Sequence, residues 1–195
     1  MKKPETIFLA SGNTHKIEEL KQVLQPLGIK LKSTLDYPDA EEVVEDQPDL
    51  QGNALKKAKF WWNKTGLPSI SDDTGLEVDA LNGAPGVYSA RYAGENPTYD
   101  DNVNKLLAEL KGEKNRSAQF RTVIAFVDSS DNYFFEGICR GKIIDEKRGD
   151  KGFGYDPIFV PEGFEKTFAE LRAEEKNKIS HRGRAVQKFI DFLRK

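Results

Sequence analysis

The chain has little sulfur and no excess of positive charge. One cysteine, Cys139, and two histidines occur among 195 residues, which excludes an internal disulfide framework and a cysteine-rich zinc site. The 30 basic and 32 acidic residues give a formal net charge of -2. This balance argues against a general nucleic-acid coat protein and against a binder of anionic membranes. Any recognition of phosphate must therefore come from a local group of residues.

Long hydrophobic runs are also missing. Only five residues of apolar character, 6–10, precede the first loop, so the sequence shows neither a signal peptide nor a run of membrane-spanning length. Together with the single cysteine, this predicts a soluble cytoplasmic protein with no membrane partner and no nucleic-acid partner. The length of 195 residues fits one domain, residues 1–195, that can bury a core of its own.

Strand and helix patterns alternate in the first part of the sequence. Residues 6–10 predict a strand, and apolar residues at helical spacing predict a helix that Gly28 ends. Residues 29–34 predict a second strand, residues 36–49 a loop, and residues 53–63 a helix.

The remainder predicts a hairpin and three helices. Two β-prone runs, residues 118–128 and 133–144, predict the antiparallel part of a sheet. One helix is predicted after a capping box at residues 98–101, a short one from Ala169, and a last one after Ser180.

Two adjacent carboxylates stand in the segment Ser71-Asp72-Asp73-Thr74-Gly75, where an apolar strand gives way to a predicted glycine turn. Neighbouring Asp side chains repel each other and are poor strand formers, so a cation or a proton to be moved best offsets their cost. Alternating apolar and acidic residues at 76–81 predict a strand after the pair. The pair is a candidate catalytic or metal site, and a capped turn is the alternative.

A second candidate site is the loop at residues 11–16, between the first strand and the first helix. Free backbone N–H groups and the positive end of the helix dipole favour an anion there, and Lys16 adds a charge. The loop has neither the Walker A ending nor the dinucleotide glycine triplet. A plain helix cap at Asn13 is the alternative, and His15 is predicted to face solvent or cap the helix rather than to bind a metal.

An aromatic residue and a cationic cluster form the third group of candidates. Glycines on both sides of Phe153 let the backbone expose the ring, which suits stacking on a base. A β-bulge with core aromatics is the alternative. The basic residues within 176–184 oppose the dipole of the helix that they begin, so a bound anion explains them better than a solvated surface. The three groups together predict a nucleoside triphosphate site.

Motifs along nearly the whole chain support this prediction. They are, in order, Ser11-Gly12-Asn13 with Lys16, Asn53-Ala54 with Lys57-Ala58, Asp72-Asp73-Thr74-Gly75-Leu76, Gly83-Ala84-Pro85-Gly86-Val87-Tyr88-Ser89-Ala90-Arg91, Phe153-Gly154-Tyr155-Asp156-Pro157-Ile158-Phe159 and Ser180-His181-Arg182-Gly183. In this order they resemble the inosine triphosphate pyrophosphatase family, whose members hydrolyse non-standard purine nucleoside triphosphates such as ITP, dITP and XTP to the monophosphate and pyrophosphate.

The resemblance implies an α/β fold, with an elongated mixed β-sheet and flanking helices that form two lobes around a central substrate cleft. It also implies a homodimer and dependence on Mg²⁺. Asp73 corresponds to the catalytic base, supported by Asp72, and Glu45 and Asp73 correspond to the magnesium ligands. The implied substrate-binding residues are Ser11, Gly12, Asn13, Thr14, His15, Lys16, Lys57, Thr74, Phe153, Gly154, Tyr155, Asp156, Lys176, His181 and Arg182. One departure is Gly52, where the family often has an acidic residue.

Two rival functions differ in what they need from the acidic pair. An aspartyl phosphatase would use Asp72 or Asp73 as a nucleophile, but its Asp-x-Asp spacing is missing. A purine-nucleotide-binding regulator without catalysis would keep Phe153 and the cations, and would gain nothing from two carboxylates.

Overall fold

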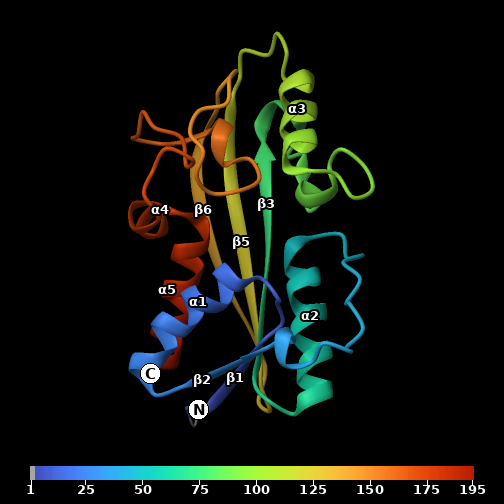
Figure 1. Cartoon of the computed structure of the whole chain (residues 1–195), viewed down its shortest axis with the longest axis vertical. Coiled ribbons are helices and arrows are strands. Elements are labelled where there is room, and N and C mark those ends of the chain that lie inside the picture. Colours follow the sequence, from blue (N-terminus) through green and yellow to red (C-terminus); the bar gives the residue numbers. More distant parts are fainter. Residues whose placement is uncertain (1–2) are drawn as a thin grey trace. The chain divides into compact units, whose positions relative to one another are not determined.

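A computed structural model describes residues 3–195 as a mixed α/β fold, which confirms the predicted class (Figure 1). Its seven-stranded sheet has the order β2-β1-β3-β5-β6-β7, with β4 paired to β3. The strands are β1 (Thr6–Leu9), β2 (Lys30–Ser33), β3 (Ser69–Val78), β4 (Pro85–Gly86), β5 (Ser117–Val127), β6 (Asn132–Ile143) and β7 (Phe159–Pro161). The α-helices are α1 (Thr14–Leu24), α2 (Leu50–Thr65), α3 (Tyr99–Glu109), α4 (Ala173–Ile179) and α5 (His181–Leu193).

The chain forms two compact units built from discontinuous segments. The first unit holds the residues up to Asp73, Val123–Glu136 and Ala185–Lys195, and the second holds Thr74–Thr122 and Gly137–Arg184. Strands β3, β5 and β6 therefore each contribute residues to both units. In β3 the change falls at the peptide bond between Asp73 and Thr74.

The first unit carries helices on both faces of its strands (Figure 1). Strand β1 pairs in parallel with β2 and with β3. Successive strand side chains point to opposite faces: Ile7 and Leu9 join the core cluster that includes α1 and α5, whereas Phe8 stacks on Trp61 of α2 at 4.4 Å between ring centroids. Burial on both faces explains why residues 123–127 of β5 are uninterrupted apolar residues.

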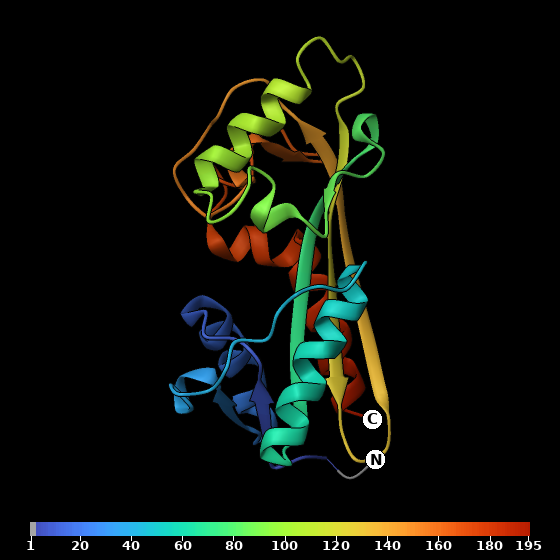
Figure 2. The ribbon, with the colours of Figure 1, turned by 90° about the vertical axis from the view of Figure 1, so that its right-hand side faces the viewer.

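The second unit buries one face of its strands beneath α3 and the segment after β6 (Figure 2). Its core includes Val103 and Leu106 of α3 together with Phe120 and Phe159. The outer face is polar there: Glu77 accepts a hydrogen bond from Gln119 at 2.7 Å. This alternation of apolar and polar residues is expected of a sheet with one solvated face.

The acidic segment is a strand, not the predicted turn. Residues 71–75 continue β3 without a break, and the strand predicted from 76 to 81 ends at Val78. Gly75 has a packing role instead: a Cβ there would clash with the carbonyl group of Gly86, which lies in the neighbouring strand β4. The glycine permits the close approach of β3 and β4, and it does not form a turn.

Two predicted helices have different limits. Helix α2 begins at Leu50 rather than at residue 53, because Asp49 caps it by accepting a hydrogen bond from the N–H of Gly52 at 2.7 Å. The short helix predicted from Ala169 begins at Ala173. The other predicted strands, the hairpin and the last helix are confirmed to within a few residues.

Within residues 3–195, no helix combines the length and apolar character needed to cross a membrane.

Candidate functional site

The two adjacent carboxylates have different partners. Asp72 is buried, and its Oδ2 lies 2.8 Å from the Nζ of Lys16 on α1. Asp73 accepts a hydrogen bond from the Nδ2 of Asn53 on α2 at 3.1 Å. Because successive side chains of a strand point to opposite faces, β3 turns the two carboxylates toward different helices. The geometry therefore links Asp72 to the phosphate loop and leaves Asp73 as the candidate base.

The loop at residues 11–16 is capped by its own side chains. Asn13 Oδ1 accepts hydrogen bonds from the N–H groups of His15 at 3.0 Å and Lys16 at 3.3 Å, and Ser11 Oγ accepts one from the N–H of Asn13 at 3.2 Å. The helix cap proposed as the alternative is thus present. Within residues 3–195, the N–H groups of Gly12 and Thr14 remain without a hydrogen-bond partner, so these two and the Lys16 ammonium are the donors that the loop offers to an anion.

Glu45 and Lys57 bring a further carboxylate to the acidic pair. The Nζ of Lys57 donates to Glu45 Oε1 and, at 2.9 Å, to the carbonyl oxygen of Asp72. One ammonium therefore links Glu45 to the backbone of β3. The structure thus brings Glu45 and Lys57 to the backbone of Asp72, whereas the assignment of Glu45 and Asp73 as metal ligands stays a prediction.

Oxygen donors at this place fit a hard divalent cation. No group of three or more His, Cys, Asp or Glu side chains arranged to hold a metal occurs within residues 3–195. Mg²⁺ commonly uses only one or two protein carboxylates and takes its other ligands from waters and substrate phosphates. Glu45 and Asp73 could supply those carboxylates, and the Lys57 ammonium on Glu45 shows that the position already attracts a positive charge.

In the second unit, two of the candidate base-site residues, Asp156 and Lys176, contact Phe153. Phe153 is 49% exposed, and the Nζ of Lys176 lies 5.1 Å from its ring centroid. Asp156 is buried and holds both neighbours, because its Oδ2 accepts hydrogen bonds from the N–H of Phe153 at 2.9 Å and from the Nζ of Lys176 at 2.5 Å. Gly152 is required here, since a Cβ would clash with this carboxylate and its φ is +75°.

Burial raises the pKa of Asp156, while Lys176 and the N–H of Phe153 act in the opposite direction. Asp156 thus acts on its neighbours from within the core. It is too buried to present a carboxylate to a base directly.

The other predicted base-site residues differ in how exposed they are. Tyr155 is buried, and its hydroxyl donates to the carbonyl of Ser89 at 2.9 Å. His181 is also buried, stacked on Phe120 with 4.7 Å between ring centroids. Arg182 is partly exposed, and Gly154 has a φ of +62° that favours glycine. Phe153 and Arg182 are therefore the members best placed to meet a ligand.

Thr74 begins the second unit's part of β3. Its hydroxyl lies 2.6 Å from the hydroxyl of Thr122 on β5. A direct substrate contact by Thr74 stays a prediction.

Sequence reasoning missed two supporting residues. Asn53 is fully buried, with Nδ2 on Asp73 and Oδ1 accepting from the N–H of Gln47 at 2.9 Å. Ser89 links Tyr155 to β3, because its carbonyl accepts from the Tyr155 hydroxyl and its Oγ accepts from the N–H of Leu76, each at 2.9 Å. Both residues lie in the motifs that carry the family resemblance. A polar residue that stands in such a motif and is also expected in the core would have indicated this supporting role.

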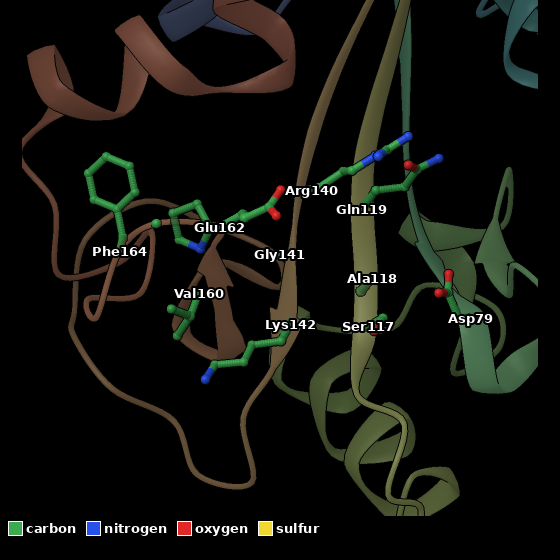
Figure 3. A pocket seen from close by; sticks show the side chains of 12 residues that line it. Asp79, Ser117, Ala118, Gln119, Arg140, Gly141, Lys142, Val160, Glu162 and Phe164 are labelled. Carbon is green, nitrogen blue, oxygen red and sulfur yellow. The ribbon is translucent and has the colours of Figure 1, made fainter.

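A cavity of about 590 Å³ in the second unit lies on the polar outer face of its strands (Figure 3). Its walls include Gln119 of β5, Arg140 and Lys142 of β6, and Phe164 after β7. None of the predicted site residues lines it.

Comparison with known proteins places these residues in one family. The model of the Ham1 family matches residues 7–192. A protein of Flavobacterium johnsoniae named dITP/XTP pyrophosphatase is 52% identical over 187 residues, which cover 96% of this chain and 97% of that protein. A Porphyromonas gingivalis protein of the same name is 48% identical and covers 97% of each chain.

Solved structures agree. The Staphylococcus aureus Ham1 protein matches with a TM-score of 0.91 at 38% identity, over 97% of this chain and 98% of that one. A Mycobacterium abscessus structure described as nucleoside-triphosphatase / dITP/XTP pyrophosphatase matches with a TM-score of 0.80 at 43% identity, over 94% and 97% of the two chains. The resemblance drawn from the motifs is confirmed, and the chain belongs to the Ham1 family.

Proposed function

We propose that this protein hydrolyses non-standard purine nucleoside triphosphates, namely dITP, ITP and XTP, to the monophosphate and pyrophosphate. It is a hydrolase of phosphoric anhydrides, as its relatives' names indicate. The observation that carries the proposal is the placement of Asp73. The buried amide of Asn53 donates to this carboxylate, and the adjacent Asp72 binds Lys16.

In this proposal the first unit binds the triphosphate. Lys16, fixed by Asp72, and the N–H groups of Gly12 and Thr14 contact the phosphate oxygens. Lys57 supplies a further positive charge to the triphosphate. Electrostatic attraction of this kind is strongest for the most highly charged ligand, which is the triphosphate.

We propose Mg²⁺ as the cofactor, held by Glu45 and Asp73. When bound, the ion would offset charge on the phosphate oxygens and on the departing pyrophosphate.

The protein itself then supplies one base for the attacking water. Asp73 takes a proton from a water whose oxygen attacks the α-phosphorus. The bond from the α-phosphorus to the oxygen bridging to the β-phosphate breaks, and its electron pair leaves with pyrophosphate. No covalent enzyme intermediate forms, in contrast to an aspartyl phosphatase.

Base selection is assigned to the second unit. Phe153 stacks on the purine, and Arg182 donates to the 6-oxo group that distinguishes hypoxanthine and xanthine from adenine. Adenine presents an amino donor there and would leave a donor unpaired, which lowers the rate by a hundredfold or more. Asp156 acts through Phe153 and Lys176, and Tyr155 acts through the carbonyl of Ser89.

We also propose that the protein is a cytoplasmic homodimer and that its small-molecule ligands are purine nucleoside triphosphates. Sedimentation velocity at micromolar concentration measures the assembly state directly.

A pyrophosphate-release panel tests the function. Wild-type protein with Mg²⁺ should release pyrophosphate from ITP, dITP and XTP far faster than from ATP, whose adenine lacks the 6-oxo group. Asp73→Asn should lose about a hundredfold to ten-thousandfold in kcat, while Asp191→Asn, an exposed acid on α5, should match the wild type.

The rival function makes the opposite prediction. A non-catalytic nucleotide-binding regulator would bind ITP in calorimetry and release no pyrophosphate with any divalent metal. That result would replace the proposed reaction by a binding function.

A further inference from the structure

Two exposed aromatic side chains of the second unit lie against each other. The rings of Tyr99 and Phe153 are 6.1 Å apart between centroids and tilted by 39°. Tyr99 keeps 60% of its surface exposed and Phe153 keeps 49%. Within residues 3–195, no other two of the exposed large apolar side chains have rings in contact; the others are Leu35, Val44, Tyr88, Phe134 and Phe164. The pair therefore brings two exposed rings into one aromatic patch.

Tyr99 is held in place without a ligand. It is the first residue of α3 and follows the cap Thr98, whose Oγ accepts from the N–H of Asp101 at 3.1 Å and donates to its carboxylate at 2.6 Å. The Nζ of Lys147 lies 2.9 Å from Asp100 Oδ1, which ties this helix start to the segment before Phe153.

The backbone of Phe153 is also held. The N–H of Phe153 is bound by the buried Asp156, and Lys176 lies over the ring. The backbone that carries each ring is thus fixed before a flat ligand binds, which lowers the entropy cost of binding.

We propose that Tyr99 is a second aromatic contact for the base and a specificity-determining residue that favours purines over pyrimidines. This inference rests on the proposed function, which assigns the base to Phe153. A purine consists of two fused rings and a pyrimidine of one. One phenyl ring can cover a pyrimidine, whereas the adjoining Tyr99 ring extends the surface to the second ring of a purine.

Steady-state kinetics on Tyr99→Ala, Tyr99→Phe and Phe153→Ala test the inference, with Phe164→Ala as the matched control. Phe164 is also a half-exposed aromatic of the second unit, but it lies away from the ring pair, on the cavity of Figure 3. Urea unfolding of each variant checks that the fold is intact.

Tyr99→Ala should raise KM for ITP about fivefold with kcat unchanged, and should leave KM for dUTP unchanged. Tyr99→Phe keeps the ring and should behave like the wild type, as should Phe164→Ala. Titration calorimetry with IMP, in the absence of divalent metal, should show the same loss of affinity for Tyr99→Ala.

The inference is overturned if Tyr99→Ala leaves KM for ITP and the affinity for IMP unchanged, or if it raises KM for ITP and dUTP equally. Either result, with normal ITP turnover by the wild type, leaves the proposed function standing. Failure of the wild type to release pyrophosphate would instead refute the proposed function, and the IMP titration would then decide the role of Tyr99 alone.

Discussion

At the scale of single residues, Asp72 and Asp73 are adjacent but differ in their surroundings. Asp72 is paired with Lys16, and Asp73 with the amide of Asn53. Asp72→Asn should therefore raise KM for ITP, because Lys16 loses the charge that positions it, and should lower kcat much less than Asp73→Asn. Lys16→Ala should reproduce the change in KM. Equal losses of kcat in the two Asp variants would assign both carboxylates to the chemical step.

Asp156 predicts a pH dependence of substrate binding. Burial places its folded-state pKa above the ordinary value for an Asp side chain, so the carboxyl takes up a proton more readily in the folded protein than in the unfolded one. Its contribution to stability therefore falls as pH rises through this window, and acidification does not unfold the protein through this group. Protonation removes the charge that holds Lys176.

KM for ITP should accordingly rise as pH falls through the raised pKa of Asp156. Asp156→Asn should have a high KM at every pH and lack this step. Urea unfolding of the wild type at the same pH values separates loss of binding from loss of fold. A step that persists in Asp156→Asn would belong to another group.

Ser71 predicts a stabilising substitution. Its hydroxyl is buried on β3 and has no hydrogen-bond partner among residues 3–195, which costs about 1 to 3 kcal/mol. Ser71→Ala should therefore increase the free energy of unfolding by about 1 kcal/mol in a urea titration. The matched control is Ser69→Ala, which removes a buried hydroxyl that donates to Leu67 O at 2.8 Å and should destabilise. Destabilisation by both would show that Ser71 has a bound water as its partner.

At the scale of elements, α5 covers part of the edge of β6. Strand β7 pairs only with residues 141–143 of β6. Before that stretch, Arg184 donates to Ile138 O at 2.6 Å and Lys188 donates to Glu136 O at 2.7 Å. Cationic side chains on an exposed strand edge prevent pairing with other chains.

Removing both cations should expose this edge. Arg184→Ala with Lys188→Ala should increase association beyond the wild-type assembly at high protein concentration, measured by sedimentation velocity. Arg194→Ala removes an exposed cation beyond the end of α5 and serves as the control. A double variant that sediments like the wild type would show that the edge is protected by other means.

The sequence predicted most elements because their periodicity is local. It failed at Gly75, where a contact with Gly86 decides the conformation, and such a contact between segments leaves no local pattern. It also gave no sign that Tyr155 and Asp156, which it placed among the substrate-binding residues, are buried by tertiary packing. At Gly52, the departure from the family pattern has a local reason: a Cβ would lie 2.8 Å from the Cβ of Gln47.

At the scale of the whole molecule, each unit has its own spectroscopic or chemical probe. Trp61 and Trp62 belong to the first unit, and the single cysteine, Cys139, is buried in the second. Burial raises the pKa of the Cys139 thiol to about 11, so the thiol stays protonated and unreactive until the unit opens.

Tryptophan fluorescence and Cys139 labelling should therefore report the same urea midpoint, because β3, β5 and β6 contribute to both units. The labelling should be done in short pulses at each urea concentration. Two separate midpoints would show that the units unfold independently.

The discontinuous composition of the first unit has a consequence for synthesis on the ribosome. Its core contains Ile7 and Ile70, made early, and Phe189 and Leu193, made near the end of this sequence. The parts of the second unit all precede Ala185. Domains usually fold from the N-terminus as the chain emerges. Here the first unit is the first to begin synthesis, but its last residues are made after all of the second unit. Until Leu193 has emerged, the apolar faces of β1 and α1 must be kept from other nascent chains.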